Sequence, residues 1–135
     1  MKTTILKNIL LSIFTLLMVT TLLASCGKSS DSKPKSAATS HKVVYKATTT
    51  NGTIDIVDYT TATGDQTTVT GISVTSYTSP EITVPTSVGS VVFAVSGGGS
   101  SASSTVTVEI YVDGNLVKSN SGTGTALAAG TSYSF

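Results

Sequence analysis

The most regular pattern of apolar and polar positions lies in residues 105–112. Val106, Val108, Ile110 and Val112 occupy every second position there. Alternation with a period of two predicts a β-strand with one buried face. The residues between them, which we expect on the exposed face of this strand, are Thr105, Thr107, Glu109 and Tyr111. These four residues form a candidate binding face.

Shorter apolar runs, separated by turn residues, continue this pattern through most of the chain. They predict strands at residues 42–48, 53–59, 65–75, 81–84, 88–96, 116–119 and 125–135. Asn51-Gly52 indicates a hairpin, because a type I′ turn needs positive φ at both central residues. Asp113-Gly114-Asn115 predicts a second tight turn. With no helix expected after Cys26, seven or eight short strands predict an all-β fold, either an antiparallel β-sandwich or a small barrel.

The same pattern predicts buried faces and interruptions. Residues expected to share a face are Val43 with Tyr45, Ile54 with Ile56 (opposite Asp55), and Val91 with Phe93 and Val95. The apolar residues shift from odd-numbered to even-numbered positions at Gly71, which predicts a bulge or a break in the strand. Pro80 and Pro85 predict that residues 81–84 form an edge strand. We expect a flexible loop at residues 97–104, which begins with three glycines, and a turn-rich loop at residues 120–124.

The first 25 residues have the features of an export signal. Lys2 and Lys7 give a positive start, residues 9–23 form an apolar run interrupted only by serine and threonine, and small residues lead to Cys26. These three parts predict a secretory signal peptide. The apolar run is short for a membrane span, which needs about 20 apolar residues. An uncleaved helix that borrows flanking residues is the alternative.

Leu23-Ala24-Ser25-Cys26 resembles the bacterial lipobox, an aliphatic residue and two small residues before an invariant cysteine. The resemblance implies cleavage between Ser25 and Cys26, a diacylglycerol on the Cys26 thiol and an acyl group on the new amine. Several acyl chains on one residue give a stable anchor. Cys26 is the only cysteine, so no disulfide competes for its thiol. The alternative is an ordinary signal peptide with a chance cysteine, and we expect no other cofactor.

Residues 26–41 predict a tether between this lipidated cysteine and a single domain at residues 42–135. After Cys26 the tether has no aliphatic residue larger than alanine, so it cannot bury enough surface to become ordered. Its root-mean-square reach is about 20 Å. The chain has no arginine, and after cleavage it would contain six lysines and seven acidic residues. Because there is no basic stripe, we expect no nucleic-acid partner.

The segment TVTVEIYVDGNLVKSNSGTGTALAAG, residues 105–130, resembles the C-terminal half of the mycobacterial small membrane protein (MmpS-type) domain. VVYKATTTNGTIDIVDYTTATGDQTTVTG (residues 43–71) and ITVPTSVGSVVFAVS (residues 82–96) are similar to it more loosely. The resemblance implies an immunoglobulin-like β-sandwich outside the cytoplasmic membrane. It also implies an accessory role beside a resistance-nodulation-division (RND) type transporter, and no catalytic residues. Family members carry a transmembrane helix where this chain has the lipobox.

Few residues of the domain suit catalysis or metal binding. His41 is the only histidine and falls at the end of the predicted tether, whereas a zinc site or a catalytic triad needs further partners. Asp55, Asp58 and Asp65 are candidate calcium ligands around one loop, although their spacing matches no EF-hand. The tyrosines could line a sugar-binding face or sit half-buried in strands: Tyr45, Tyr59, Tyr77, Tyr111 and Tyr133.

We therefore expect a lipid-anchored, non-enzymatic cell-envelope protein with an immunoglobulin-like binding domain, accessory to an envelope transporter. The alternative is a surface adhesin or carbohydrate-binding module. A flat patch formed by Tyr111 and the threonine-rich face would favour this alternative. An enzyme would need a cleft that joins several polar side chains with displaced pKa values. Gly27 follows the cysteine in place of the aspartate that favours the inner membrane, so we expect the outer membrane, on its periplasmic face or the cell surface.

Overall fold

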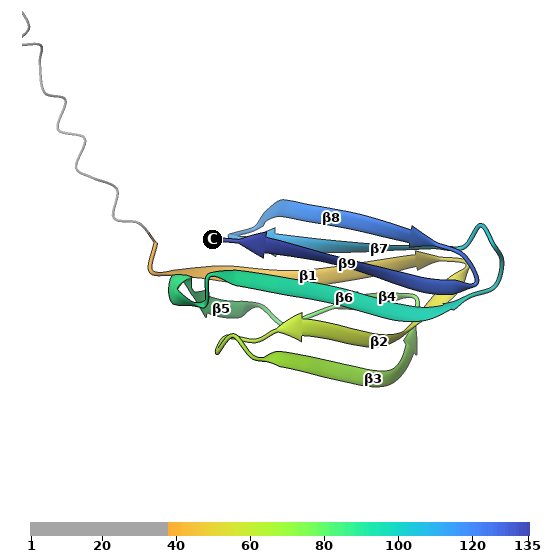
Figure 1. The fold of residues 1–135 in the computed structure, drawn as a ribbon, viewed down its shortest axis with the longest axis horizontal. Helices are drawn as coiled ribbons and strands as arrows, with labels where there is room; N and C mark the ends of the chain where they lie inside the picture. The colour runs from red at the N-terminus through yellow and green to blue at the C-terminus, as the bar shows by residue number, and fades with distance from the viewer. Residues whose placement is uncertain (1–37) are drawn as a thin grey trace, which may run out of the picture. The chain divides into compact units, whose positions relative to one another are not determined.

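The structure is a computed structural model that describes residues 38–135. The expected all-β sandwich is confirmed, with two antiparallel sheets packed face to face (Figure 1). The described residues include no helix with the length and hydropathy that crossing a bilayer requires. The predictions for the signal peptide, Ser25, Cys26 and most of the tether concern residues outside the described part.

Sheet A has the strand order β4-β1-β7-β8, and β5 also pairs with β1. Its strands are β1 (Ser40–Thr50), β4 (Ser76–Thr78), β5 (Ile82–Pro85), β7 (Thr105–Val112) and β8 (Asn115–Thr123). Sheet B has the order β3-β2-β6-β9. Its strands are β2 (Gly52–Thr60), β3 (Gln66–Val74), β6 (Ser90–Gly99) and β9 (Ala126–Ser134). One 3-10 turn, η1 (Thr86–Val88), joins β5 to β6.

The strand order matches the immunoglobulin pattern in sheet B and departs from it in sheet A. Sheet B matches strands C′, C, F and G, and in sheet A the pairing of β1 with β5 matches that of B with E. In the immunoglobulin fold, strand A lies beside strand B. Here β7 lies at the corresponding position beside β1, although it comes later in the chain and forms a hairpin with β8. Nine strands form, beyond the seven or eight expected, because Ser76–Thr78 pairs with β1 as a separate short strand.

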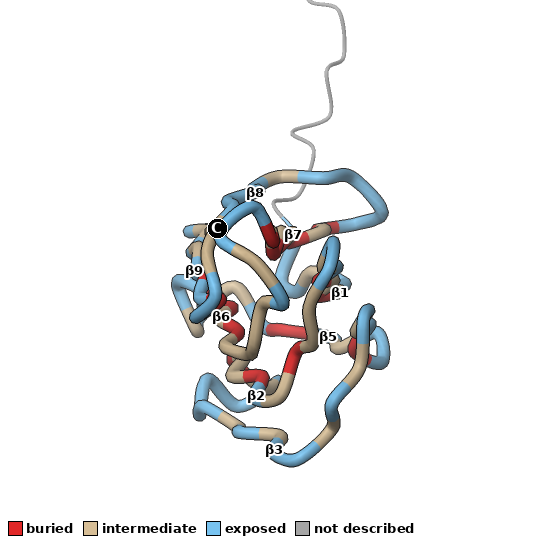
Figure 2. The backbone as a smooth tube through the Cα atoms, turned by 90° about the vertical axis from the view of Figure 1, so that its right-hand side faces the viewer, coloured by how far each residue is buried: buried red, intermediate tan, exposed pale blue. Residues whose placement is uncertain are grey.

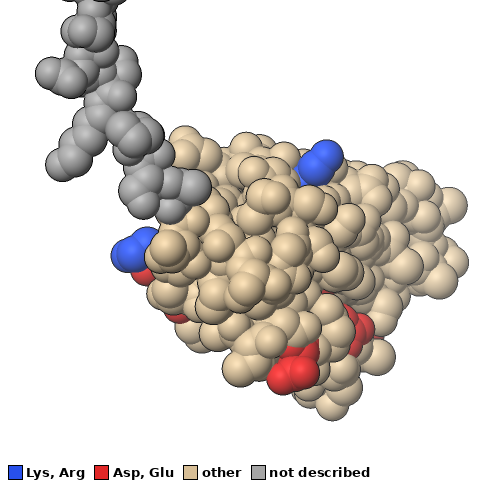
Figure 3. All heavy atoms as spheres, turned by 60° about the vertical axis from the view of Figure 1, so that its left-hand side comes forward, with Lys and Arg blue, Asp and Glu red and all other residues tan. Residues whose placement is uncertain are grey.

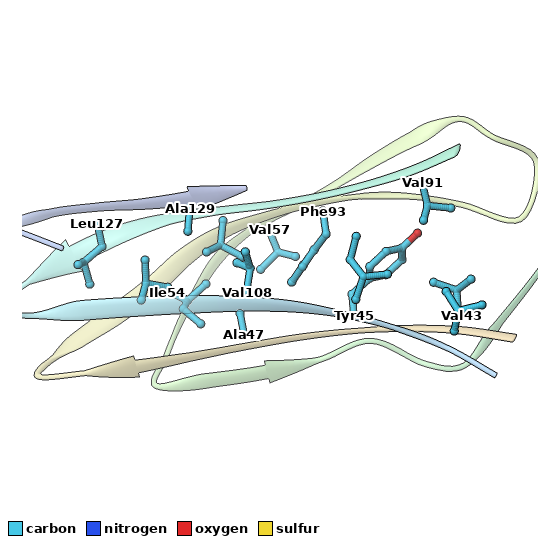
Figure 4. Close-up of a cluster of buried hydrophobic side chains, with 14 of the residues drawn as sticks. Val43, Tyr45, Ala47, Ile54, Val57, Val91, Phe93, Val108, Leu127 and Ala129 are labelled. Atoms are coloured by element: carbon cyan, nitrogen blue, oxygen red, sulfur yellow. The ribbon is translucent and has the colours of Figure 1, made fainter. Parts of the chain in front are cut away.

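The core lies between the two sheets and is built by the predicted alternation. Figure 2 shows that the buried stretches lie where the sheets face each other, and Figure 4 shows side chains from both sheets meeting there. The fully buried Tyr45 and Phe93 contact each other across the layers, with ring centroids 5.2 Å apart. The predicted buried faces of β1, β6 and β7 are confirmed by Val43, Tyr45, Val91, Phe93, Val95 and the four alternating residues of β7.

The prediction that Ile54 and Ile56 share a buried face is wrong for Ile56. Ile54 is buried, whereas Ile56 is 37% exposed and the next residue, Val57, is buried instead. The register of β2 shifts between Ile54 and Ile56 against both neighbouring strands. A bulge that inserts one residue turns the following side chains to the other face. The irregularity predicted at Gly71 of β3 is confirmed opposite this bulge, and Gly71 has a φ of 70°.

Two segments predicted as loops are in part strands, because their glycines allow two backbones to approach closely. Residues 97–99 complete β6, and residues 120–123 complete β8. A Cβ atom on Gly97 would lie 1.9 Å from the carbonyl oxygen of Thr53, and one on Gly122 would lie 2.0 Å from that of Ala128. Glycine at these positions lets two backbones approach closely. The prediction of an edge strand between the prolines is confirmed, since β5 pairs only with β1.

Candidate functional site: the outward face of sheet A

The four residues of the candidate binding face lie together on the outward side of β7. Thr105, Thr107, Glu109 and Tyr111 are each half-buried and alternate with the buried residues of that strand. Strand β7 lies in the middle of sheet A, so neighbours from β1 and β8 extend this face on both sides. These neighbours are Val44, Lys46, Thr48 and Thr50 on β1, and Leu116, Ser119, Ser121 and Thr123 on β8.

Cross-strand pairing arranges hydroxyl side chains into two rows, which we call the hydroxyl rows. The first is Ser76-Thr48-Thr107-Ser121, and the second is Thr50-Thr105-Thr123. Strand geometry places neighbours within a row about 4.8 Å apart and the two rows about 7 Å apart. Within the first row the hydroxyls of Thr107 and Ser121 are hydrogen-bonded at 2.9 Å. The result is a regular, uncharged polar patch on a pleated surface.

Beside the hydroxyl rows, a lysine, an aromatic residue and a glutamate form a connected group. The Lys46 Nζ lies 4.5 Å from the centroid of the Tyr111 ring, a cation–π contact. The Tyr111 hydroxyl donates a hydrogen bond of 3.0 Å to Oε2 of Glu109. This hydrogen bond, followed by partial burial, raises the pKa of Tyr111. Each of the three side chains is therefore held in place by another, although all of them contact solvent.

A row of apolar side chains lies at the other end of the same face, and we call it the apolar row. It consists of Val44, Tyr111 and Leu116, which are direct cross-strand neighbours on β1, β7 and β8. Leu116 is 50% exposed. The sequence pattern did not identify Val44 or Leu116 as part of this face, because their proximity to Tyr111 depends on the strand register. For Leu116 the available signal was the Asp113-Gly114 turn, because a two-residue hairpin loop places Leu116 opposite Tyr111.

The expectation that His41 falls in an unordered tether is wrong. Strand β1 begins at Ser40, so His41 lies within it, and its side chain is 21% exposed. Its Nδ1 pairs with Oδ2 of Asp113 at 2.7 Å, and its ring stacks on Phe135 with centroids 4.9 Å apart. Both partners come from far along the chain, so the composition around His41 could not predict them.

Asp113 links the β7–β8 turn to the start of β1. Its Oδ1 accepts a hydrogen bond of 2.9 Å from the backbone N–H of Lys42, and its Oδ2 contacts His41. These two hydrogen bonds, the one with His41 first, lower the pKa of the Asp113 carboxyl. Lys42 in turn forms a 2.7 Å ion pair with Glu81, whose hydrogen bond and charge raise the pKa of Lys42. The start of β1 is thus held by two carboxylates from separate elements.

The three aspartates considered as calcium ligands have different surroundings. Asp58 accepts a hydrogen bond from Thr68 on β3, and Asp65 accepts one of 2.8 Å from Thr63 in the β2–β3 connection. Asp55 lies at the bulge of β2. Among residues 38–135, no three His, Cys, Asp or Glu side chains gather closely enough to hold a metal ion.

The tyrosines do not form one sugar-binding face. Tyr45 is fully buried, and its hydroxyl donates to the carbonyl oxygen of Thr60 at 2.9 Å. Tyr59 and Tyr77 pack near it, and burial followed by a hydrogen bond with Tyr59 raises the pKa of Tyr77 to about 12. Tyr133 contacts the ring of Phe135 edge to face. Only Tyr111 lies on the outward face of sheet A, so the alternative of half-buried strand residues describes the other tyrosines better.

Comparison with known proteins finds no matching family model and no matching curated protein. The resemblances to the lipobox and to the MmpS-type domain therefore stay predictions that rest on the residues quoted for them.

Proposed function

We propose that this chain is a lipid-anchored, non-catalytic cell-envelope protein whose sandwich domain binds a neutral, hydroxyl-rich polymer through the outward face of sheet A. The observation that carries the binding role is the pair of hydroxyl rows, which cross sheet A without interruption. The anchor rests on the lipobox-like segment that ends at Cys26. Covalent diacylglycerol and an N-acyl group would hold the domain at the membrane.

The chemistry of the hydroxyl rows suits an uncharged polysaccharide. Each serine or threonine hydroxyl both donates and accepts hydrogen bonds, as do the hydroxyls of a sugar. Seven such groups lie at regular spacing, and none of them is buried. Lys46 and Glu109 are cross-strand neighbours, so their charges offset each other beside the rows. A long polymer lying along a row would contact several hydroxyls at once, which compensates for the weakness of each single contact.

The anchor is tested by expressing the full chain and a Cys26→Ala variant with a radiolabelled fatty acid. We expect label in the parent protein only, and a parent protein that sediments with membranes, most of it with the outer membrane. The variant should be unlabelled and released from the membrane or retained as an uncleaved precursor. An unlabelled parent protein would contradict the lipid anchor.

The binding face is tested by co-sedimentation of the protein with insoluble neutral polysaccharides and with isolated cell envelopes. In a Thr48→Val, Thr107→Val variant, both hydroxyls at the centre of the first row are replaced by methyl groups of nearly the same volume. We expect at least a roughly tenfold loss of affinity, since two hydrogen bonds of about 1 kcal/mol each are removed. A matched control is Thr68→Val, Thr70→Val on β3 of sheet B, which should bind as the parent does.

A second candidate function is an accessory role beside an RND-type transporter. It is favoured by the likeness of residues 105–130 to the MmpS-type domain. In-cell crosslinking of the lipidated protein, followed by mass spectrometry, separates the two candidates. Repeated capture of one large transporter would support the accessory role. Capture of bulk lipoproteins alone would contradict it and leave the polymer-binding proposal in place.

A further inference from the structure

The outward face of sheet A changes character along its strands, from hydroxyl rows at one end to the apolar row at the other. Leu116, in the apolar row, is 50% exposed, more than the other two large exposed hydrophobic residues of the described chain, Val92 at 41% and Ile56 at 37%. Tyr111 lies directly opposite Leu116 on β7, and Val44 lies directly opposite Tyr111 on β1. A leucine and two further apolar surfaces are therefore offered to the solvent side by side.

The apolar row lies at the end of sheet A where β1 begins. The backbone N–H of Asp113, in the β7–β8 turn, donates a hydrogen bond of 2.8 Å to the carbonyl oxygen of Lys42. Leu116 follows that turn directly, and Figure 1 shows the turn and the start of β1 at the same end of the sandwich. The tether that the sequence predicts at residues 26–41, with a reach of about 20 Å, joins the domain at this end. The apolar row is thus at the end closest along the chain to Cys26.

The residues around the apolar row are those that suit a membrane surface. Tyrosine is enriched where bilayers meet water, because its ring is apolar and its hydroxyl is polar. The Lys46 side chain covers the Tyr111 ring and exposes its ammonium, which can reach lipid phosphates. The nearby carboxylates each have a partner: Glu109 with Tyr111, Glu81 with Lys42, and Asp113 with His41. The side of the domain in Figure 3 shows only scattered charges among uncharged atoms.

We propose that the apolar row docks on the membrane that holds the Cys26 lipid, with Leu116 inserted at the boundary between headgroups and acyl chains. This inference rests on the proposed lipid anchor. A contact of three side chains is weak alone, but a short tether makes it intramolecular, at an effective concentration in the millimolar range. The hydroxyl rows begin four residues farther along β1, about 13 Å from the apolar row, and so extend beyond the headgroups.

The absence of tryptophan from the chain allows a direct test. Leu116→Trp places a single fluorescent side chain in the apolar row, and Ile56→Trp places one on the outward face of sheet B as a matched control. Each lipidated full-length protein is reconstituted in vesicles of phosphatidylethanolamine and phosphatidylglycerol, with and without a lipid that carries bromine atoms near the top of its acyl chains. We expect blue-shifted emission from the Leu116→Trp protein and about twofold quenching by the brominated lipid, as for a side chain ~5–10 Å into the boundary. The control should show neither.

The possible results separate the docking proposal from the proposed anchor. Protein that floats with the vesicles but shows equal, unquenched emission from both variants would overturn docking and leave the anchor intact. A blue shift without quenching would also overturn it, and would indicate contact with a second copy of the chain. Protein that does not float with vesicles would overturn both proposals.

A second measurement avoids dependence on the tryptophan variants. Amide hydrogen exchange at residues 111–117 of the lipidated parent protein should slow on vesicles relative to detergent micelles. The Leu116→Ser protein should lose that difference, whereas an Ile56→Ser protein should keep it. Equal protection in the parent protein and in Leu116→Ser would contradict docking through the apolar row.

Discussion

The hydroxyl of Tyr45 in β1 donates a hydrogen bond of 2.9 Å to the carbonyl oxygen of Thr60 at the end of β2. The two residues belong to different sheets, and both are buried. The Thr60 hydroxyl also accepts a hydrogen bond of 2.9 Å from the backbone N–H of Val92 on β6. The hydrogen bond between Tyr45 and Thr60 is therefore a buried polar link that joins the two sheets.

Tyr45→Phe should lower the free energy of unfolding by about 1–3 kcal/mol, because the buried carbonyl oxygen of Thr60 loses its donor. The ring and its contact with Phe93 stay in place, so the loss reports the hydrogen bond. Denaturant unfolding at neutral pH measures it. Tyr77→Phe is the control: Tyr77 is only partly buried, so its loss should be smaller, and an equal loss in both variants would contradict this role for Tyr45.

Stability should fall as the pH rises above about 10, the ordinary pKa of tyrosine. Burial raises the pKa of Tyr45 well above that value and, as its largest cause, raises that of Tyr77 to about 12. In this range the unfolded chain loses protons that the folded chain keeps, so each unit of pH costs about 1.4 kcal/mol per such tyrosine. Urea unfolding between pH 9 and about 11 tests this. The free energy of unfolding should fall less steeply with pH in Tyr45→Phe than in the parent protein. An unchanged slope would show that Tyr45 ionises in the folded protein.

Acid should weaken the start of β1 through Asp113. Its folded-state pKa is lowered by the hydrogen bond with His41 and then by that of the Lys42 N–H. The stability from this carboxylate is therefore present above the unfolded value of about 3.9 and is lost as the pH falls through the lowered folded value. Asp113→Asn should lose stability at neutral pH and show a smaller further loss at acid pH. Asparagine tolerates the positive φ of 51° at this position. If the free energy of unfolding fell equally with decreasing pH in the parent protein and in Asp113→Asn, this linkage would be ruled out.

Gly97→Ala should lower the free energy of unfolding by about 2 kcal/mol or more, because its Cβ would overlap the carbonyl oxygen of Thr53. The neighbouring Gly98→Ala is a matched control, since its Cβ would find its nearest atom, the Thr53 hydroxyl oxygen, at 3.8 Å. We expect the control to change stability by no more than about 0.5 kcal/mol. Thermal unfolding of both variants compares them, and equal values would show that β2 and β6 separate without cost.

The candidate site could be predicted in part. The alternation in β7 places Thr105, Thr107, Glu109 and Tyr111 on one side of a strand, because successive side chains of a strand point to opposite faces. The partners that turn this strand into a surface, such as Thr48 and Leu116, come from β1 and β8. Their alignment depends on register, which no local pattern contains. Binding by this face and lipidation of Cys26 both stay predictions.

The sequence by itself determined the local features of the domain. Asp113-Gly114 predicts a tight turn, and β7 and β8 pair across it with positive φ at both residues. The hairpin predicted at Asn51-Gly52 is wrong: β1 and β2 belong to different sheets, and of these two residues only Asn51 has a positive φ, so the turn carries the chain from one sheet to the other. Alternating apolar residues determined the strands and most of the core, since both follow from the geometry of a single strand.

Only the tertiary structure decided where that local pattern fails. The bulge at Asp55 exposes Ile56, and the contact between Gly97 and Thr53 turns a predicted loop into strand. His41 is ordered by Asp113 and Phe135, both distant in the chain. In each case the deciding contact comes from another strand or from a turn remote in sequence. Such contacts depend on how strands pair and layers pack, and composition and periodicity describe only one segment at a time.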